Sequence, residues 1–171
     1  MSQGSNHGSE QDAPPKGGGK GRYATRGPRH RARELALQAL YACEVAGTPV
    51  DRAAREAADD RNAEGADMEY YHQLMPAVWN RREMLDGWVI RAVDNWTPER
   101  VSVIERNILR VGAHEILYEP ATPLNVIINE AIEVAKRFGS EQSGRFVNGV
   151  LDRVAALIRD ADAAPYRQWG E

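Results

Sequence analysis

The densest group of reactive side chains in the sequence is a run of basic residues near the N-terminus. Its members are Arg22, Arg26, Arg29, His30, Arg31 and Arg33. Guanidinium groups present a planar fork of donors that fits phosphate oxygens and base edges, and they stack on aromatic planes. The Ala, Leu, Glu and Gln residues that follow predict a helix over about 29–46. Because exposed cations at a helix N-terminus cost about 0.3–1 kcal/mol each and a bound phosphate is stabilised there, the run favours RNA contact over a helix start that only promotes solubility.

The charge of the chain is unevenly distributed. The formal net charge is −3, yet residues 1–33 hold seven Lys or Arg and two acidic residues, so this segment carries +5 and the other 138 residues carry −8. A basic arm on an acidic body is typical of proteins that contact nucleic acid. A solvated tail that aids solubility gives the same distribution, so charge alone leaves both interpretations open.

Patterns for catalysis or metal binding are weak. Glu130 and Glu133 are spaced as paired carboxylates would be, but no histidine or second carboxylate pair completes a site, which favours a solvated acidic face. The lone Cys43 falls in an Ala/Leu stripe and is interpreted as a core residue, and the four histidines are scattered. The segment GGGKG lacks the strand and the Ser or Thr of a P-loop. We therefore expect no catalytic residue, no metal and no cofactor.

Hydrophobic periodicity predicts an all-α protein, a bundle of six or seven helices. The expected helical segments are about 29–46, 50–63, 68–95, 98–118, 123–138 and 143–160. Pro76 predicts a bend or a break in the third segment. Thr97 and Thr122 are predicted caps, each followed by a proline at the first helical position, and Gly139 is a predicted terminator.

The flanking segments differ in composition from this domain. Residues 1–28, rich in Gly, Ser, Pro and Gln, predict a disordered basic tail, residues 29–160 the helical domain, and 161–171 a C-terminal tail. No apolar run approaches the ~18 residues of a membrane span, and the polar N-terminus lacks the apolar segment of a secretory signal. The expected location is the cytoplasm, without a membrane partner.

Three blocks of the sequence resemble, in order and spacing, the NusB family of bacterial transcription antitermination factors. They are RHRARELALQALY at 29–41, IERNILRVGAHEI at 104–116 and PLNVIINEAIEVAKRFGSEQSGRFVNGVLDRVA at 123–155. The third block is the most specific. Some methyltransferases of ribosomal RNA carry a similar module, but the chain stops at Glu171, so we expect a free-standing factor. The resemblance implies two three-helix subdomains packed together.

The resemblance also implies a function. Members of the family bind the boxA element of nascent ribosomal RNA leaders jointly with NusE, a small-subunit ribosomal protein, and join NusA, NusG and RNA polymerase in a complex that resists termination. Several members are homodimers when free. The alternative is a protein-binding helical scaffold or homodimer without direct RNA recognition. A steep fall of RNA affinity with salt would distinguish the two, because phosphate contacts release counterions.

By position, the resemblance assigns RNA contacts to ten residues. These are Arg29, His30, Arg31, Arg33, Arg110, Phe138, Gln142, Arg145, Phe146 and Asn148. Tyr41, which also falls on the inward stripe of the first helix, and Glu105 match positions that the family links to RNA or NusE binding. Gln142 stands where relatives are acidic, which leaves RNA affinity and dependence on NusE open. His114 stands where relatives usually carry Tyr, and only a change in packing is expected.

The chemistry of several of these side chains admits a second interpretation. Phe138 and Phe146 flank the turn GSEQSG, and base stacking on an exposed aromatic contributes about 1–3 kcal/mol. Phe146 also falls on a core stripe, which favours burial. Arg110 and Arg145 are ordinary solvated charges unless they face the same groove as the first helix. Asn148 could bind a base edge or bond to the neighbouring backbone.

If the basic run binds RNA, replacing Arg31 and Arg33 together by Ala should weaken boxA binding. From the macrodipole alone, thermal stability should stay unchanged or rise slightly. A titration with boxA RNA and a thermal melt measure the two effects. Unchanged RNA affinity would contradict the assignment, and lost stability with intact RNA binding would favour a structural role.

Overall fold

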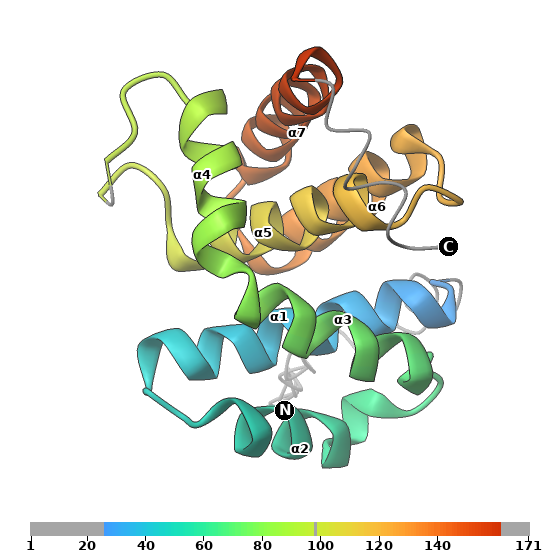
Figure 1. Ribbon diagram of the computed structural model, residues 1–171. Helices are drawn as coiled ribbons and strands as arrows, with labels where there is room; N and C mark the ends of the chain where they lie inside the picture. The colour runs from blue at the N-terminus through green and yellow to red at the C-terminus, as the bar shows by residue number, and fades with distance from the viewer. Residues whose placement is uncertain (1–25, 98, 162–171) are drawn as a thin grey trace, which may run out of the picture.

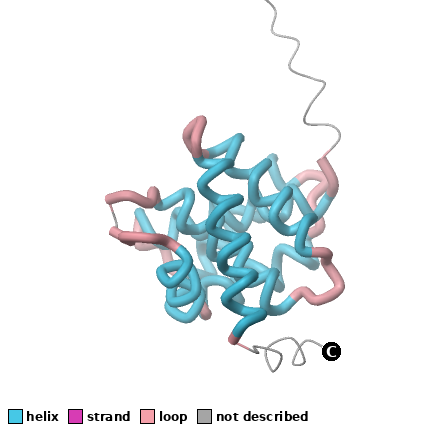
Figure 2. Tube along the Cα trace, turned by 90° about the horizontal axis from the view of Figure 1, so that it is seen from above, coloured by secondary structure: helices cyan, strands magenta, loops and turns pink. Residues whose placement is uncertain are grey.

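A computed structural model describes residues 26–97 and 99–161, and all regular structure in these segments is helical (Figures 1 and 2). The α-helices are α1 Pro28–Val45, α2 Val50–Asp59, α3 Met68–Asn80, α4 Arg82–Ala92, α5 Val103–Tyr118, α6 Leu124–Phe138 and α7 Ser143–Asp160, with a 3-10 turn η1 at Arg61–Ala63. The predicted all-α bundle is confirmed. The predicted tails lie outside the described residues apart from 26–28 and 161. None of the described helices is long and apolar enough to cross a membrane.

The helices form two packed groups. In Figure 1, α1, α2 and α3 lie below α4, α5, α6 and α7, and α1 packs on its own group and on α5 above it. The second group therefore has four helices where the resemblance implied three. A continuous apolar core runs through both groups. Its large, fully buried members include Leu35, Leu40, Tyr71, Leu74, Met75, Leu85, Leu109, Ile116, Leu117, Ile127 and Leu151.

The ends of α1 and α3 can be compared with the helix ends that glycine and proline residues predict. Helix α1 stops before Gly47, whose φ of +64° suits glycine, as the sequence predicts. The third predicted segment does break, but at Arg81, between α3 and α4, and not at Pro76, which lies inside α3. The carbonyl that Pro76 leaves without a helical donor belongs to His72, an exposed residue, so the missing hydrogen bond costs little there.

The predicted start of the fifth helix is also wrong. Thr97 accepts a turn hydrogen bond from the amide of Arg100, and α5 begins only at Val103. Ser102 and Glu105 form a capping box in which each side chain accepts the backbone N–H of the other residue, at 3.1 Å in both directions. This reciprocal pair satisfies two amides, which explains why the helix starts here. At α6 the shift is one residue, since Pro123 rather than Thr122 is the cap, and Gly139 ends the helix as predicted.

Helices α5 and α7 approach closely at Gly112. A Cβ at this position would lie 2.7 Å from Leu151 Cδ1 and 2.8 Å from Cδ2, inside a fully buried contact. Gly87, in α4, is the opposite case, because a Cβ there would meet nothing within 4 Å. The two glycines are both helical and differ only in the space beside them.

We expect Gly112→Ala to lower the free energy of unfolding by about 1–3 kcal/mol, because the α5–α7 contact must open to admit the methyl group. Gly87→Ala is the matched control and should raise it by about 0.5–1 kcal/mol through lower backbone entropy of the unfolded chain. Urea denaturation measures both. Equal effects of the two substitutions would show that the α5–α7 contact adapts freely.

Candidate nucleic-acid interface

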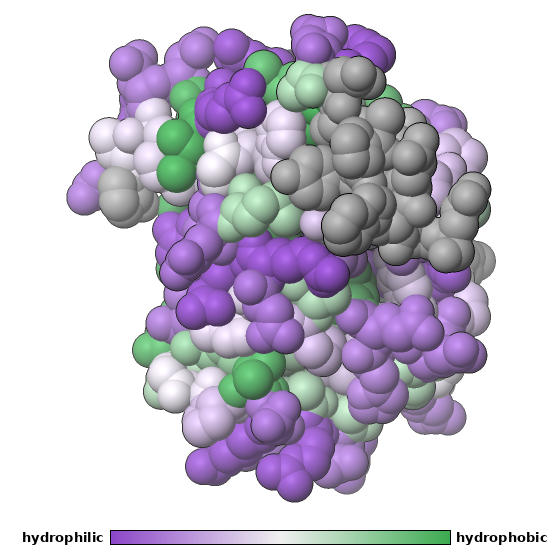
Figure 3. All heavy atoms as spheres, in the orientation of Figure 1, coloured by the Kyte–Doolittle hydropathy of each residue, from purple (hydrophilic) through white to green (hydrophobic). Residues whose placement is uncertain are grey.

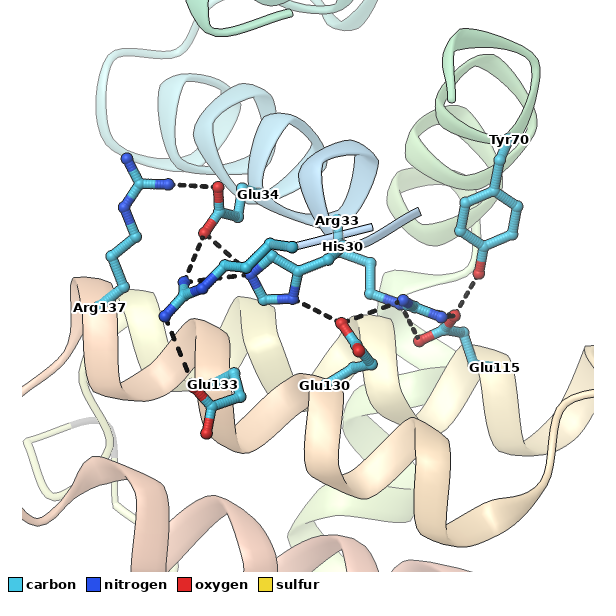
Figure 4. Close-up of polar contacts among 9 residues, drawn as sticks. His30, Arg33, Glu34, Tyr70, Glu115, Glu130, Glu133 and Arg137 are labelled. Atoms are coloured by element: carbon cyan, nitrogen blue, oxygen red, sulfur yellow. Dashed lines mark hydrogen bonds and ion pairs between the residues drawn. The ribbon is translucent and has the colours of Figure 1, made fainter. Parts of the chain in front are cut away.

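The first turns of α1 cross α6, and a histidine lies at the crossing (Figure 4). The buried His30 contacts Glu130 of α6 through Nδ1 at 2.5 Å and Glu34 of α1 through Nε2 at 3.0 Å. Burial alone would lower the pKa of His30, but the hydrogen bonds to the two carboxylates outweigh it and raise the pKa above its ordinary value. The hydrogen bond from His30 in turn lowers the pKa of Glu130. The crossing is therefore held by ionic side chains.

Further ion pairs extend this crossing toward the end of α6. Arg137 of α6 pairs with Glu34, and Arg26, just before α1, lies 3.3 Å from Glu34 and 3.5 Å from Glu133 of α6. The guanidinium of Arg137 also lies over the ring of Phe138, 4.9 Å from its centroid. The solvated acidic face predicted for α6 is thus wrong for Glu130 and in part for Glu133, since both partner cations from the N-terminal basic run.

Arg33 is the most deeply enclosed of the run's arginines that the structure describes. Its Nε and Nη2 donate to the Glu115 carboxylate of α5 at 2.8–3.1 Å, and the hydroxyl of Tyr70 from α3 donates to the same carboxylate (Figure 4). The side chains of Arg33 and Glu115 are only 5% and 2% exposed. Three helices are joined at this carboxylate. A buried pair of this kind is costly to break, because either partner alone would be a desolvated charge.

Arg110 belongs to a second buried network, at the other end of α1. Its guanidinium donates to Asp86 of α4 through Nε and Nη2, both at 2.7 Å, and to Glu44 of α1 at 3.0 Å. The amide of Asn107 supports Glu44 at 2.9 Å. The prediction that Arg110 is an ordinary solvated charge is wrong. It joins α1, α4 and α5.

The structure therefore divides the ten residues assigned to RNA. His30, Arg33 and Arg110 are buried in ion pairs, so they hold helices together in this conformation. The others reach the surface wholly or in part: Arg29, Arg31, Phe138, Gln142, Arg145, Phe146 and Asn148. Phe146 is half-buried against the core, close to the burial predicted for it. Phe138 is half-buried as well, at the end of α6.

Exposed Arg29 and half-buried Arg31 of α1 have different neighbours. Arg29 lies over the ring of Tyr70, 4.3 Å from the centroid, and 3.8 Å from a carboxylate oxygen of Asp67. Arg31 has a different partner and donates to the backbone oxygen of Glu64 at 2.5 Å. The basic run is thus not one cationic patch. It supplies buried ion pairs at His30 and Arg33 and cations nearer the surface at Arg26, Arg29 and Arg31.

The two positions linked to partner binding also differ. Tyr41, predicted on the inward stripe of α1, is 43% exposed instead. Glu105 completes the α5 capping box and accepts a hydrogen bond from Ser143 Oγ at 2.7 Å, and the same hydroxyl accepts the amide of Ser140 at 2.9 Å. Glu105 thereby fastens the α6–α7 turn, which carries Gln142, to the start of α5.

Sequence reasoning missed Glu34 and Arg137 as parts of this surface and named Arg26 only as a member of the basic run, without its acidic partners. The signal was present as two complementary stripes: positions 26, 30 and 34 repeat every fourth residue, and positions 130, 133 and 137 share one face of α6. Nothing local indicated that the two stripes meet. Within 26–97 and 99–161, no group of three or more His, Cys, Asp or Glu side chains is arranged to hold a metal ion.

The buried Arg33 changes the stability expected for its substitution. We expect Arg33→Ala to cost about 3–5 kcal/mol of unfolding free energy, since Glu115 is left as a buried, unpaired charge. Arg29→Ala, at a side chain that is 51% exposed, is the matched control and should cost no more than about 1 kcal/mol. Adding Glu115→Ala to Arg33→Ala should cost less than the sum of the single changes. Strict additivity in urea denaturation would contradict the pairing.

His114 affects the pH dependence of stability as well as the packing expected of it. The ring is buried in α5 against Tyr118, with centroids 4.9 Å apart, and its Nδ1 has no hydrogen-bond partner among the described residues. Burial, with a smaller contribution from the nearby charge of Arg81, lowers the pKa of His114 to about 4. The folded protein therefore keeps this ring neutral at pH values where the unfolded chain protonates it.

Because the folded pKa lies below the unfolded value near 6.5, His114 makes stability fall as the pH drops below 6.5. Between pH 8 and pH 5 this loss amounts to about 2 kcal/mol. His114→Phe removes it, so the stability of the variant relative to the parent should rise by that amount over this interval. Urea denaturation at both pH values checks it, and a pH-independent difference would show that the ring is protonated in the folded state.

Known proteins of the NusB family match the part of the chain that contains the three similar sequence blocks. The model of the NusB family matches residues 30–156. The transcription antitermination protein NusB of Myxococcus xanthus is 42% identical over 136 residues, covering 77% of this chain and 97% of that protein, and NusB of Xanthomonas campestris pv. campestris (strain B100) is 43% identical over 135 residues, covering 79% and 84%.

Solved structures extend the comparison to the fold. T. maritima NusB is 36% identical with a TM-score of 0.67, covering 77% of this chain and 92% of that chain. A NusB in a crystal structure of NusB and NusE with double-stranded RNA is 25% identical with a TM-score of 0.68, covering 75% and 96%. The match of the family model over most of the chain, the identity to these relatives and the shared fold lead to one conclusion: the chain belongs to the NusB family of transcription antitermination factors.

Proposed function

We propose that this protein binds the boxA element of nascent ribosomal RNA leaders jointly with NusE, and that the pair joins NusA, NusG and RNA polymerase in an antitermination complex. Membership of the NusB family and a similar structure solved with NusE and RNA support the proposal. The role is one of binding without a catalytic step or a cofactor, and the cytoplasm is its proposed place of action.

The observation that carries the proposal is the surface around the α1–α6 crossing. Arg31 from α1 and Arg137 with Phe138 from α6 reach the surface there, and the turn that follows α6 leads directly to exposed Gln142 and Arg145. Cations and an aromatic ring in one neighbourhood suit a single strand, whose phosphates need charge and whose bases need a stacking partner. The surface is built from two segments that are far apart in the chain, the start of α1 and the end of α6 with the turn that follows it.

Each exposed residue receives a role in this proposal. Arg29, Arg31 and Arg145 contact phosphates, Phe138 offers a partly exposed ring to a base, and the amides of Gln142 and Asn148 face base edges. Exposed Tyr41 is the proposed NusE contact. Glu105 acts through the α6–α7 turn that it fastens to α5. His30, Arg33 and Arg110 position these groups by holding the helices together.

The test is a titration of the chain, with and without NusE, against single-stranded boxA RNA, its duplex and a scrambled strand over a series of salt concentrations. Arg145→Ala should weaken boxA binding and reduce the slope of log K against log [salt] by about 0.7, the value for one phosphate contact on a single strand. Arg159→Ala, an exposed arginine in the last turn of the same helix, is the control with the same charge change and should leave the slope unchanged.

Equal affinity for boxA and scrambled RNA, with NusE present, would contradict the proposal. The alternative is a helical scaffold or homodimer that contacts only proteins. It requires NusE binding, or self-association in sedimentation, that is insensitive to Arg145→Ala and to added RNA.

A further inference from the structure

A polar cavity of about 220 Å³ lies between α1, η1 and the end of α6. Four arginines and two glutamates line it, leaving a net charge of +2: Arg26, Arg31, Arg61, Arg137, Glu34 and Glu64. Gln38 and Asn62 add side-chain amides, and the fully buried Leu35 gives an apolar contact. Of the residues that the resemblance assigns to RNA, only Arg31 lines this cavity. Its η1 wall lies in a segment that carried no functional signal in the sequence.

We propose that this cavity binds one nucleotide of the RNA strand, with its phosphate at Arg61 and Arg31 and its base edge at Gln38 and Asn62. The inference rests on the proposed function and adds to it a specific subsite. The cavity is smaller than the 300–1,000 Å³ of sites for drug-sized ligands, which suits a single unit of a polymer. It lies between α1 and Arg137, so a strand that follows the α1–α6 crossing toward Phe138 passes its mouth.

Arg61 is the cation of the cavity best suited to an incoming phosphate. Its side chain makes no hydrogen bond or ion pair with residues 26–97 or 99–161, whereas Arg26 and Arg137 already partner Glu34. An arginine of this kind can bind a phosphate without first breaking an internal pair. The free energy gained when Arg61 binds a phosphate is therefore not reduced by the loss of an existing contact.

The position of Arg31 is fixed by the turn that follows η1. Gly65 has a φ of +75°, and a Cβ there would lie 2.7 Å from Arg31 Nη1. The Nη1 end of the guanidinium thus lies against a residue without a side chain, and this nitrogen donates to the Glu64 carbonyl at 2.5 Å. This holds a planar, charged fork of donors in the wall of the cavity, in the form that binds phosphate oxygens.

The amides give the cavity a means to distinguish a nucleotide from a bare anion. Gln38 and Asn62 each offer two donors and one acceptor, the groups that pair with the edges of unstacked bases. Inorganic phosphate could use only the arginines. A base should therefore add affinity that phosphate alone does not show.

The first experiment follows the side-chain amide signals of Gln38 and Asn62 by NMR in the full chain, titrated with each nucleoside 5′-monophosphate and, separately, with inorganic phosphate. At least one monophosphate should shift these signals at concentrations fivefold or more below those needed with phosphate. Equal response to phosphate would reduce the site to an anion site and overturn the inference.

The second experiment measures boxA RNA binding in a salt series. Arg61→Gln should lower affinity about fivefold or more and the salt slope by about 0.7. Arg55→Gln, at an exposed residue of α2 outside the cavity, is the control with the same charge change and should have a smaller effect on both. Gly65→Ala displaces Arg31 without changing charge and should also weaken the monophosphate response, with a thermal melt to verify folding.

The outcomes separate the subsite from the proposed function. If the parent binds boxA and Arg61→Gln matches Arg55→Gln, the subsite is wrong and the proposed function stands. If the parent binds no RNA, the proposed function is wrong. The monophosphate titration then tests nucleotide binding in the cavity by itself. An absence of shifts at Gln38 and Asn62 overturns the inference that the cavity binds a nucleotide.

Discussion

The arrangement of the two helix groups depends on one buried ion pair, Arg33 with Glu115. The pair is enclosed where α1, α3 and α5 meet, and the Tyr70 hydroxyl completes the carboxylate's contacts. Apolar contacts alone tolerate sliding, whereas a buried charge without its partner is strongly unfavourable. The observed register of α1 against α5 satisfies both partners. The Arg110 network with Asp86 and Glu44 applies the same constraint at the other end of α1. On the face seen in Figure 3, exposed hydrophilic side chains also lie along the junction of the groups.

These pairs also answer why cations gather at the start of α1. A helix N-terminus disfavours positive charge, and a bound phosphate is one way to compensate. In the folded protein, carboxylates of α5 and α6 provide that compensation for His30 and Arg33. The unfavourable effect of positive charge at the N-terminus of α1 is therefore offset within the protein, without a ligand. Binding is left to the cations beside the buried ones, such as Arg29 and Arg31. Buried residues that stabilise the fold therefore alternate with surface residues that are available to bind RNA between Arg29 and Arg33.

This alternation decides which substitutions report on recognition. A change at Arg33 alters the junction of the helix groups as well as the charge, so weaker RNA binding would not identify it as a contact. Arg31, Arg61 and Arg145 lie at the surface, and their substitution changes charge with little effect on the core. The cavity beside η1 likewise depends on tertiary position. It is built by a segment of ordinary composition that becomes relevant only through its position next to α1.

The sequence by itself determined the helical architecture, the family and several helix ends, because periodicity, Gly47 and Gly139 act over a few residues. It was wrong at Pro76 and Thr97, where signals of equal local strength competed and packing or the Ser102–Glu105 box prevailed. Only the tertiary structure decided which basic residues are buried. Arg33 and Glu115 are 82 positions apart, and no local pattern encodes their meeting. The state of a charge depends on what surrounds it, and its surroundings are assembled from the whole chain.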